Sequence, residues 1–337
     1  MKNKGIIGSI IAIAVILIGV FAYQMGSRQT TSSATTDSSE LQTVGILQFI
    51  SHPSLDQIKD GVVDGLKDAG YVDGENIKIE YLNGQGDQSK LDTMSQQLIS
   101  KNSDVLVGVA TPAAKALANA TSDIPVVMGA ISDPVGSGLV KSLEEPGNNV
   151  TGLNNLSPVN QQIELAKELL PEAKTVGMIY SSSEENSLAQ IARAEKKAAD
   201  EGYTVNKYAI SSSNEISQIT QQAAGENDFL YIPQDNIIAN AFDTLVQEAD
   251  KAKIPVFVSV DNMVKQGGVA TVGQNQYQMG IETGKIAAEM LAGADPAKTP
   301  VTVIDTGDTI INETKAAELG ITIPDNLKNK AELVEGD

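Results

Sequence analysis

Short apolar runs alternate with helical segments through most of this chain, and this alternation restricts the fold more than any other feature. Residues 43–50 (TVGILQFI) are typical of a buried parallel strand. A helix is predicted to begin at Ser54 and to end at Gly70, because apolar residues recur in it at helical spacing. Further strands are predicted at 77–82, 105–109, 125–131, 176–180, 204–209, 229–232 and 256–260, with helices between them. Strand–helix alternation of this kind predicts βαβ units with right-handed crossovers.

The alternation stops after residues 149–153 and then begins again with a helix at 157–170, which indicates two lobes. A short sequence similarity between the halves supports this division, because segments 67–71 and 199–203 both end a predicted helix with Gly-Tyr before a strand. We therefore predict an α/β protein with two doubly wound parallel-sheet lobes joined by a hinge, with a ligand cleft between them. At the predicted helix 276–292 and the segment 301–305, near its C-terminal end, the chain is expected to cross this hinge again. The predicted boundaries are 43–155 with 274–304 for lobe 1, and 156–273 with 305–330 for lobe 2; one helix is predicted at 236–251.

The N-terminal segment has the pattern of a membrane anchor or a signal peptide. Lys2 and Lys4 precede an apolar run over residues 5–23, whose length is close to the roughly 20 residues that span a bilayer. No clear A-x-A cleavage site follows, so a retained anchor is favoured over cleavage. Residues 24–42 are rich in Ser and Thr and are predicted to be a flexible linker. The folded part is then expected on the extracellular side of the plasma membrane, or secreted after cleavage.

Composition excludes several classes of function. The net charge of −19 argues against binding to nucleic acid, which requires basic patches. The chain has no cysteine and one histidine, so a Ser-His-Asp triad or a zinc site would be hard to assemble. The G-x-G at 84–86 lacks a third glycine and follows a second strand, so it is a weak dinucleotide motif. We predict no enzyme activity, no catalytic residues, no metal site and no cofactor.

Polar residues follow nearly every predicted strand, and the carboxyl ends of parallel strands form the ligand crevice of open α/β sheets. Any one of these residues is more often a helix cap or loop residue than a ligand contact. Their recurrence in both lobes favours a binding site. The predicted ligand-binding residues are Gln48, Phe49, Thr111, Ser132 and Asp133 in lobe 1 and Glu185, Asn186, Ser187, Asp235, Asn236 and Asp261 in lobe 2. Glu184 is interpreted as a helix cap.

The residue types of this rim favour a zwitterionic ligand. The rim is poor in Lys and Arg, which a phosphate or a dicarboxylate would need. Helix N-termini and hydroxyl groups suit a carboxylate, and Asp or Glu suits an ammonium group. Four aromatic residues near strand ends either line an apolar pocket or belong to the ordinary core: Phe49, Tyr180, Tyr231 and Phe257.

Several motifs resemble ABC-transporter substrate-binding proteins of the tryptophan-binding type. They include VGILQF at 44–49 with His52-Pro53, GVVDGL at 61–66, GQGD at 84–87, ATPAA at 110–114, SDPV at 132–135, PGNNVTG at 146–152, Tyr180 with ENS at 185–187, PQDN at 233–236, IPVF at 254–257 and GITIP at 320–324. The resemblance covers essentially all of residues 43–325. It departs from the family pattern in one respect: relatives are commonly lipoproteins, whereas this chain has no cysteine to lipidate.

The resemblance implies a type 1 periplasmic-binding-protein fold and a role in an ABC importer with separate permease and ATPase subunits. Carried onto this chain, Thr111 and Ser132 match the residues that hold an α-carboxylate, and Asp261 or Asp235 matches the acid that holds the ammonium group. The expected ligand is L-tryptophan or a related aromatic amino acid, bound by a monomer through hinge closure. The alternatives are a branched-chain amino acid, a purine or nucleoside as ligand, or a membrane-tethered ligand sensor.

Overall fold

The computed structural model describes residues 41–336. The predicted anchor at residues 1–23, and the predicted linker up to residue 40, lie outside the described residues. Within residues 41–336, no helix combines the length and the apolar character that a membrane crossing requires. Residues from Gln42 onward form one compact unit that contains two sheets.

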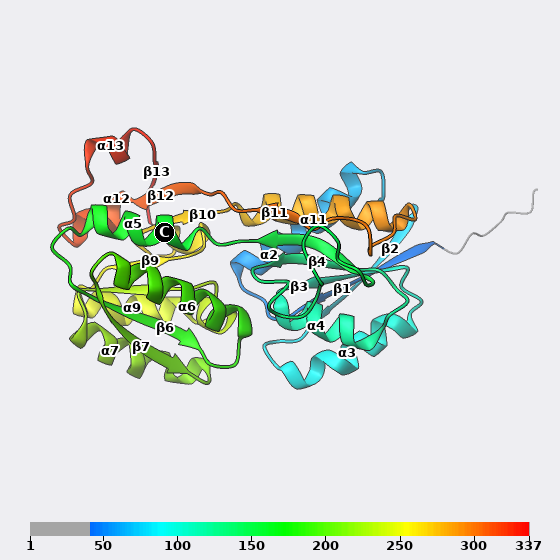
Figure 1. The fold of residues 1–337 in the computed structure, drawn as a ribbon, viewed down its shortest axis with the longest axis horizontal. Helices are drawn as coiled ribbons and strands as arrows, with labels where there is room; N and C mark the ends of the chain where they lie inside the picture. The colour runs from blue at the N-terminus through cyan, green and yellow to red at the C-terminus, as the bar shows by residue number, and fades with distance from the viewer. Residues whose placement is uncertain (1–40, 337) are drawn as a thin grey trace, which may run out of the picture. The chain divides into compact units, whose positions relative to one another are not determined.

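The first sheet has six parallel strands in the order β11-β5-β4-β3-β1-β2. These strands are β1 (Gln42–Gln48), β2 (Ile77–Asn83), β3 (Val105–Val109), β4 (Val126–Ile131), β5 (Val150–Asn155) and β11 (Thr302–Ile304). Helices α2 (Pro53–Asp68) and α11 (Gln276–Leu291) cover one face, and α3 (Gln88–Ser100) and α4 (Thr111–Ala120) cover the other (Figure 1). The order β2-β1-β3-β4-β5 is that of a doubly wound fold.

The second sheet has seven strands in the order β13-β12-β10-β9-β8-β6-β7. They are β6 (Thr175–Ser181), β7 (Thr204–Ile210), β8 (Phe229–Ile232), β9 (Val256–Val258), β10 (Ala270–Gly273), β12 (Asp308–Asn312) and β13 (Glu332–Val334). Its helices are α5 (Val159–Leu169), α6 (Glu185–Asp200), α7 (Ile216–Glu226), α8 (Asn236–Asn240), α9 (Phe242–Ala252), α10 (Asn262–Lys265), α12 (Glu313–Glu318) and α13 (Asp325–Lys328). Strands β10 and β12 pair antiparallel, and the other pairs are parallel. The order β7-β6-β8-β9-β10 repeats that of the first sheet.

The chain passes between the two sheets after β5, after β10 and after β11 (Figure 1). The two-sheet α/β fold predicted from the alternation is therefore confirmed. One helix prediction was wrong: the segment 236–251 forms two helices, α8 and α9, because the backbone of Ala241 leaves the helical region with φ −124° and ψ 26°.

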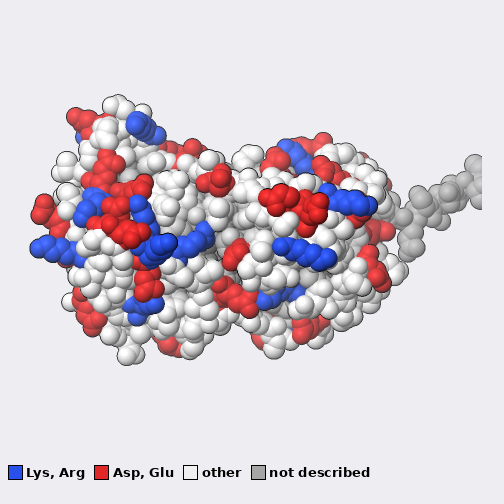
Figure 2. Space-filling view, in the orientation of Figure 1, with Lys and Arg blue, Asp and Glu red and all other residues white. Residues whose placement is uncertain are grey.

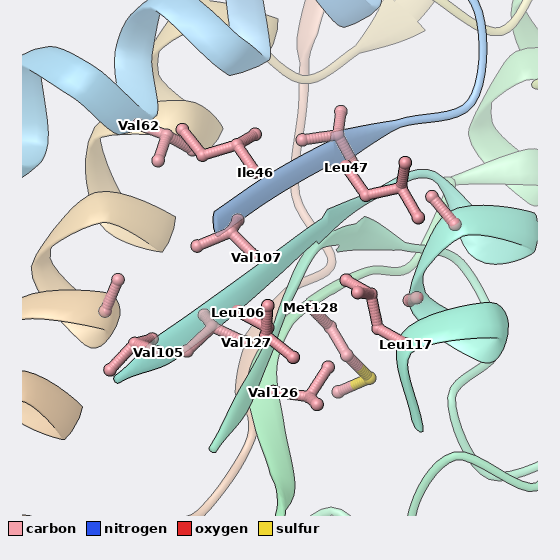
Figure 3. Close-up of a cluster of buried hydrophobic side chains, with 14 of the residues drawn as sticks. Ile46, Leu47, Val62, Val105, Leu106, Val107, Leu117, Val126, Val127 and Met128 are labelled. Carbon is pink, nitrogen blue, oxygen red and sulfur yellow. The ribbon is translucent and has the colours of Figure 1, made fainter. Parts of the chain in front are cut away.

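The core of the first lobe consists of aliphatic side chains on both faces of its sheet (Figure 3). Val62 of α2 lies beside Ile46 of β1 on one face, and Leu117 of α4 lies on the opposite face. All three side chains are fully buried. Because the sheet is buried on both faces, the sequences of its strands are continuous apolar runs rather than alternating apolar and polar residues.

Acidic and basic side chains are interspersed on the face of the molecule drawn in Figure 2. Exposed ion pairs such as Lys207–Glu195, at 2.8 Å, contribute about 0–1 kcal/mol each. The apolar cores, rather than these surface pairs, therefore supply the larger share of the stability.

Candidate functional site

A cavity lies where the carboxyl ends of strands from both sheets meet. In this arrangement of the lobes the cavity has a volume of about 50 Å³, which is below the range of about 300–1,000 Å³ for small-molecule sites. First-lobe residues around it come from the starts of α2 and α4 and from the ends of β4 and β5, and second-lobe residues come from the starts of α6 and α8. Its lining consists of His52, Ser54, Leu55, Ile58, Ala110, Thr111, Ala130, Ser132, Asn155, Asn186, Gln234, Asp235, Asn236, Ala239, Val260 and Gln276.

The first-lobe wall is built on unusual backbone conformations. Ala110 has φ 75° and ψ 153°, and Ala130 has φ 58°, although alanine rarely adopts a positive φ. Ala110 is the N-cap of α4, and no side chain caps that helix, so its first N–H groups begin at the cavity beside Thr111. Ser132 follows β4 directly, beyond the register shift in that strand. Strain of this kind is a common property of ligand sites.

The second-lobe wall carries a buried carboxyl group, that of Asp235. Asp235 Oδ2 accepts hydrogen bonds from Ser181 N and Ser187 Oγ, both at 2.6 Å, and Oδ1 accepts one from Ile238 N at 3.0 Å. The bond from Ile238 N makes Asp235 the N-cap of α8, and Oδ1 keeps acceptor capacity. Burial raises the pKa of Asp235 above its ordinary value.

Glu184 lies behind this wall and is completely buried. Its Oε2 accepts hydrogen bonds from Asn236 Nδ2 at 2.5 Å and Asn186 Nδ2 at 3.2 Å, and its Oε1 accepts one from Ile237 N at 2.9 Å. Burial, with a smaller contribution from the charge of Asp235, raises the pKa of Glu184 to about 8. Glu184 is the N-cap of α6 by position, but its side chain makes no cap hydrogen bond. It positions two amides of the cavity wall instead.

Several hydrogen bonds and an ion pair cross between the lobes around the cavity. His52 Nε2 lies 3.2 Å from Asn236 Oδ1, and Ser54 Oγ donates to Asn262 Oδ1 at 2.9 Å. At the outer edge, Lys115 pairs with Glu185 at 2.5 Å. The lobes therefore meet in a closed arrangement.

Three polar atoms of the lining are buried and have no hydrogen-bond partner within the described residues. They are His52 Nδ1, Ser132 Oγ and Asn186 Oδ1. The amide of Asn186 is oriented by the backbone, because its Nδ2 donates to the carbonyl oxygen of Gln234 at 2.9 Å. An unpartnered buried polar atom costs about 1–3 kcal/mol. Three of them around one cavity therefore indicate a place where a polar ligand supplies the missing partners.

The structure brings five of the predicted site residues to this cavity: Thr111, Ser132, Asn186, Asp235 and Asn236. Ser187 does not line it but holds Asp235 through its hydroxyl group. The remaining five lie elsewhere: Gln48, Phe49, Asp133, Glu185 and Asp261.

These five residues have other partners or surroundings. Gln48 donates to Ile50 O and Asp56, and Phe49 is part of the first-lobe core. Asp133 Oδ1 accepts from Gly136 N, as a turn residue does. Asp261 lines a separate surface pocket and accepts from its neighbour Asn262 N. Apart from Phe49, the aromatic residues near strand ends pack in or against the second-lobe core, as Tyr231 and Phe257 do, and none lines the cavity.

Sequence reasoning missed other lining residues, chiefly His52, Ser54, Asn155, Gln234 and Gln276. The signal for His52 and Ser54 was available, because they follow the first strand just as Thr111 and Ser132 follow later ones. Nothing in the local sequence separates Gln276 from other helix-start residues. No cluster of acidic or histidine side chains within residues 41–336 has the arrangement of a metal site.

Comparison with known proteins gives consistent similarities. A family described as ABC transporter substrate binding protein matches residues 43–335. A tyrosine-binding protein of Clostridioides difficile (strain R20291) is 37% identical over 332 residues, which cover 97% of this chain and 96% of the relative.

Two solved structures are similar to this chain over most of its length. The crystal structure of an ABC domain in complex with L-Trp from Streptococcus pneumonia is 46% identical, with a TM-score of 0.85, and covers 87% of this chain and 100% of its own. The ligand-free, open structure of a substrate binding protein with adhesive properties from Clostridium difficile is 36% identical, with a TM-score of 0.68, and covers 88% of this chain and 100% of its own. The TM-score is therefore higher against the L-Trp complex than against the ligand-free, open structure.

Proposed function

Because the chain belongs to the ABC transporter substrate binding protein family, we propose that it binds an aromatic amino acid between its lobes and delivers it to the permease of an ABC importer. This family consists of binding proteins rather than enzymes. The ligand is tryptophan or tyrosine in its zwitterionic form, and it contacts both lobes at once. The site acts by recognition and closure, without a chemical step.

The observation that carries this proposal is a pair of buried acids without a cation. Asp235 and Glu184 are buried side by side, and burial raises the pKa of each carboxyl group. Neither acid belongs to an ion pair within residues 41–336. A buried carboxylate is normally paired. The ammonium group of an amino acid beside Asp235 Oδ1 and Asn186 Oδ1 would supply the missing positive charge.

The opposite wall suits the carboxylate of the same ligand. The uncapped start of α4 offers backbone N–H groups and the positive end of the helix dipole. The hydroxyl groups of Thr111 and Ser132 lie at the same wall, and Ser132 Oγ has no partner within residues 41–336. A zwitterion therefore fits the cavity in one orientation, with its carboxylate at lobe 1 and its ammonium group at lobe 2.

The rest of the lining suits an apolar side chain. Leu55, Ile58, Ala110, Ala130 and Val260 form this part of the wall, and all but Ala130 are buried. The relatives support an aromatic ligand, because one is named for tyrosine and another was crystallised with L-Trp.

Transport follows from the closure of the lobes on the ligand. A ligand that contacts both lobes favours the closed arrangement, and a permease that recognises this arrangement selects loaded protein. This role places the folded part outside the cytoplasm, next to the membrane that holds the permease.

Ligand analogues test the proposal without altering the protein. Isothermal titration calorimetry of the full-length chain should give 1:1 binding of L-tryptophan. Tryptamine lacks the carboxylate and indole-3-propionate lacks the ammonium group, and each should bind roughly a hundredfold more weakly or worse, since each leaves buried partners unpaired. Equal affinity for L-tryptophan and indole-3-propionate would contradict the pairing with Asp235.

A further inference from the structure

His52, the only histidine of the chain, lines the cavity, and its Nδ1 has no hydrogen-bond partner among residues 41–336. It precedes α2 as the N-cap residue and makes no side-chain cap. Its side chain is buried, and burial lowers the pKa of His52 to about 4. The imidazole is therefore neutral near pH 7, with one nitrogen as a donor and the other as an acceptor.

The neighbouring hydrogen bonds determine which nitrogen accepts. Asn236 Nδ2 donates to Glu184 Oε2, so Asn236 Oδ1 is the atom that faces His52 Nε2. An amide oxygen only accepts, so Nε2 carries the proton and Nδ1 holds a free lone pair. Glu184 in turn accepts from the fixed backbone N–H of Ile237. The ammonium group of a bound amino acid would keep Glu184 ionised, since a nearby positive charge lowers the pKa of a carboxyl group.

His52 lies on the first-lobe side of the cavity, close in sequence to part of its apolar lining. Leu55 and Ile58 follow it on the first turns of α2, and both belong to the apolar part of the lining. The acceptors assigned to the ammonium group, Asp235 Oδ1 and Asn186 Oδ1, belong to the other lobe.

We propose that His52 Nδ1 accepts a hydrogen bond from the indole N–H of tryptophan or the phenol O–H of tyrosine, so that the cavity rejects phenylalanine. This inference rests on the proposed function and names the residue that selects among aromatic amino acids. A ligand without the donor leaves Nδ1 buried and unpaired, and a site built to bond an N–H or O–H group discriminates strongly against analogues that lack it.

The direct test compares L-tryptophan with L-3-benzothienylalanine, in which sulfur replaces the indole N–H and the shape is retained. Titration calorimetry of the wild-type chain should show the analogue binding roughly ten- to a hundredfold more weakly. In His52→Phe the two ligands should bind within about threefold of each other, because no acceptor remains to be left unpaired.

A matched control separates selection from closure, because His52 also bonds Asn236 across the lobes. Lys115→Ala removes the cross-lobe ion pair with Glu185, and neither residue lines the cavity. This variant should weaken both ligands by the same factor and keep the wild-type ratio between them. A ratio that collapses in Lys115→Ala would assign the discrimination to lobe closure and overturn the proposal.

The single histidine also allows a test that needs no variant. In ¹⁵N-labelled protein the two imidazole nitrogens give assignable resonances, and the Nδ1 resonance should shift with L-tryptophan but much less with the benzothienyl analogue. Equal affinities together with an unshifted Nδ1 resonance would overturn this inference while leaving amino acid binding intact. Absence of binding by both ligands and by L-tyrosine would instead overturn the proposed function.

Discussion

Buried hydroxyl groups without hydrogen-bond partners lower the stability of the folded protein. Among residues 41–336, Ser132 Oγ at the cavity and Thr271 Oγ1 in β10, away from the cavity, are both buried without a hydrogen-bond partner. Both hydroxyl groups carry the same kind of penalty in the unliganded protein. A ligand carboxylate can relieve the penalty only at Ser132.

Ser132→Ala should therefore stabilise the unliganded protein by about 1 kcal/mol and weaken L-tryptophan binding by about tenfold. Thr271→Val is the matched control, which should stabilise by a similar amount and leave the affinity unchanged. Urea unfolding and calorimetry measure the two quantities. A Ser132→Ala variant with wild-type affinity would show that the hydroxyl group does not meet the ligand.

Polar residues after strands were predictable from the sequence, but their side-chain directions were not. Thr111, Ser132 and Asn186 reach the cavity because they follow strands whose carboxyl ends meet there. Asp261 also follows a strand, yet it lies in a different pocket, because β9 ends at Val258 and the chain has turned before it. Glu184 was interpreted as a cap, since nothing in the local sequence indicates that α8 lies close enough to receive its carboxyl group.

At the scale of elements, α2 and α11 pack backbone against backbone. Glycines at 61 and 65 of α2 face glycines at 280 and 284 of α11. A Cβ atom at Gly61 would lie 2.3 Å from Tyr277 O, and one at Gly284 would lie 2.3 Å from Val62 O. This close packing holds the first turn of α2, and with it His52 and Leu55, at the cavity.

Gly61→Ala should destabilise the protein by about 2–3 kcal/mol, because the helices must separate, although alanine favours helix by about 1 kcal/mol. Gly225→Ala is the matched control in α7, where a Cβ would meet nothing within 4 Å. That variant should be stabilised by about 0.5–1 kcal/mol. Chemical unfolding measures both changes, and equal effects of the two substitutions would contradict the account of the α2–α11 contact.

The elements themselves were largely predictable, because buried parallel strands and amphipathic helices have distinct periods. The break between α8 and α9 was not, since the apolar spacing continues through Ala241 while the backbone does not. The short strands β10, β12 and β13 were also missed. Strand β12 pairs with β10, and β13 pairs with β12 at the edge of the sheet. Each partner is distant in sequence, and the local residue pattern does not determine such pairing.

At the scale of the whole molecule, the buried histidine links folding to pH. The pKa of His52 is lowered from 6.5 to about 4, so the unfolded chain takes up a proton first as pH falls. Its contribution to stability is complete above pH 6.5 and is lost progressively down to pH 4. Glu184, with its pKa raised to about 8, acts in the opposite direction, because stability falls as pH rises from 4.5 to 8.

Replacing His52 by Gln isolates the first of these effects. Between pH 7 and pH 5 the wild-type free energy of unfolding should fall by about 2 kcal/mol more than that of His52→Gln, since other groups titrate alike in both proteins. Urea unfolding at the two pH values measures the difference. Parallel losses in the two proteins would mean that His52 is accessible to protons in the folded state.

The cavity between the lobes is proposed to bind an aromatic amino acid as a zwitterion. A thermal-shift screen of the full-length chain against the amino acids, common sugars, purines and nucleosides tests it most directly. L-Tryptophan and L-tyrosine should give the largest rise in melting temperature, since a ligand at a hundred times its Kd stabilises the folded state by about 2.7 kcal/mol. A rise with a sugar or a nucleoside, and none with any amino acid, would contradict the claim.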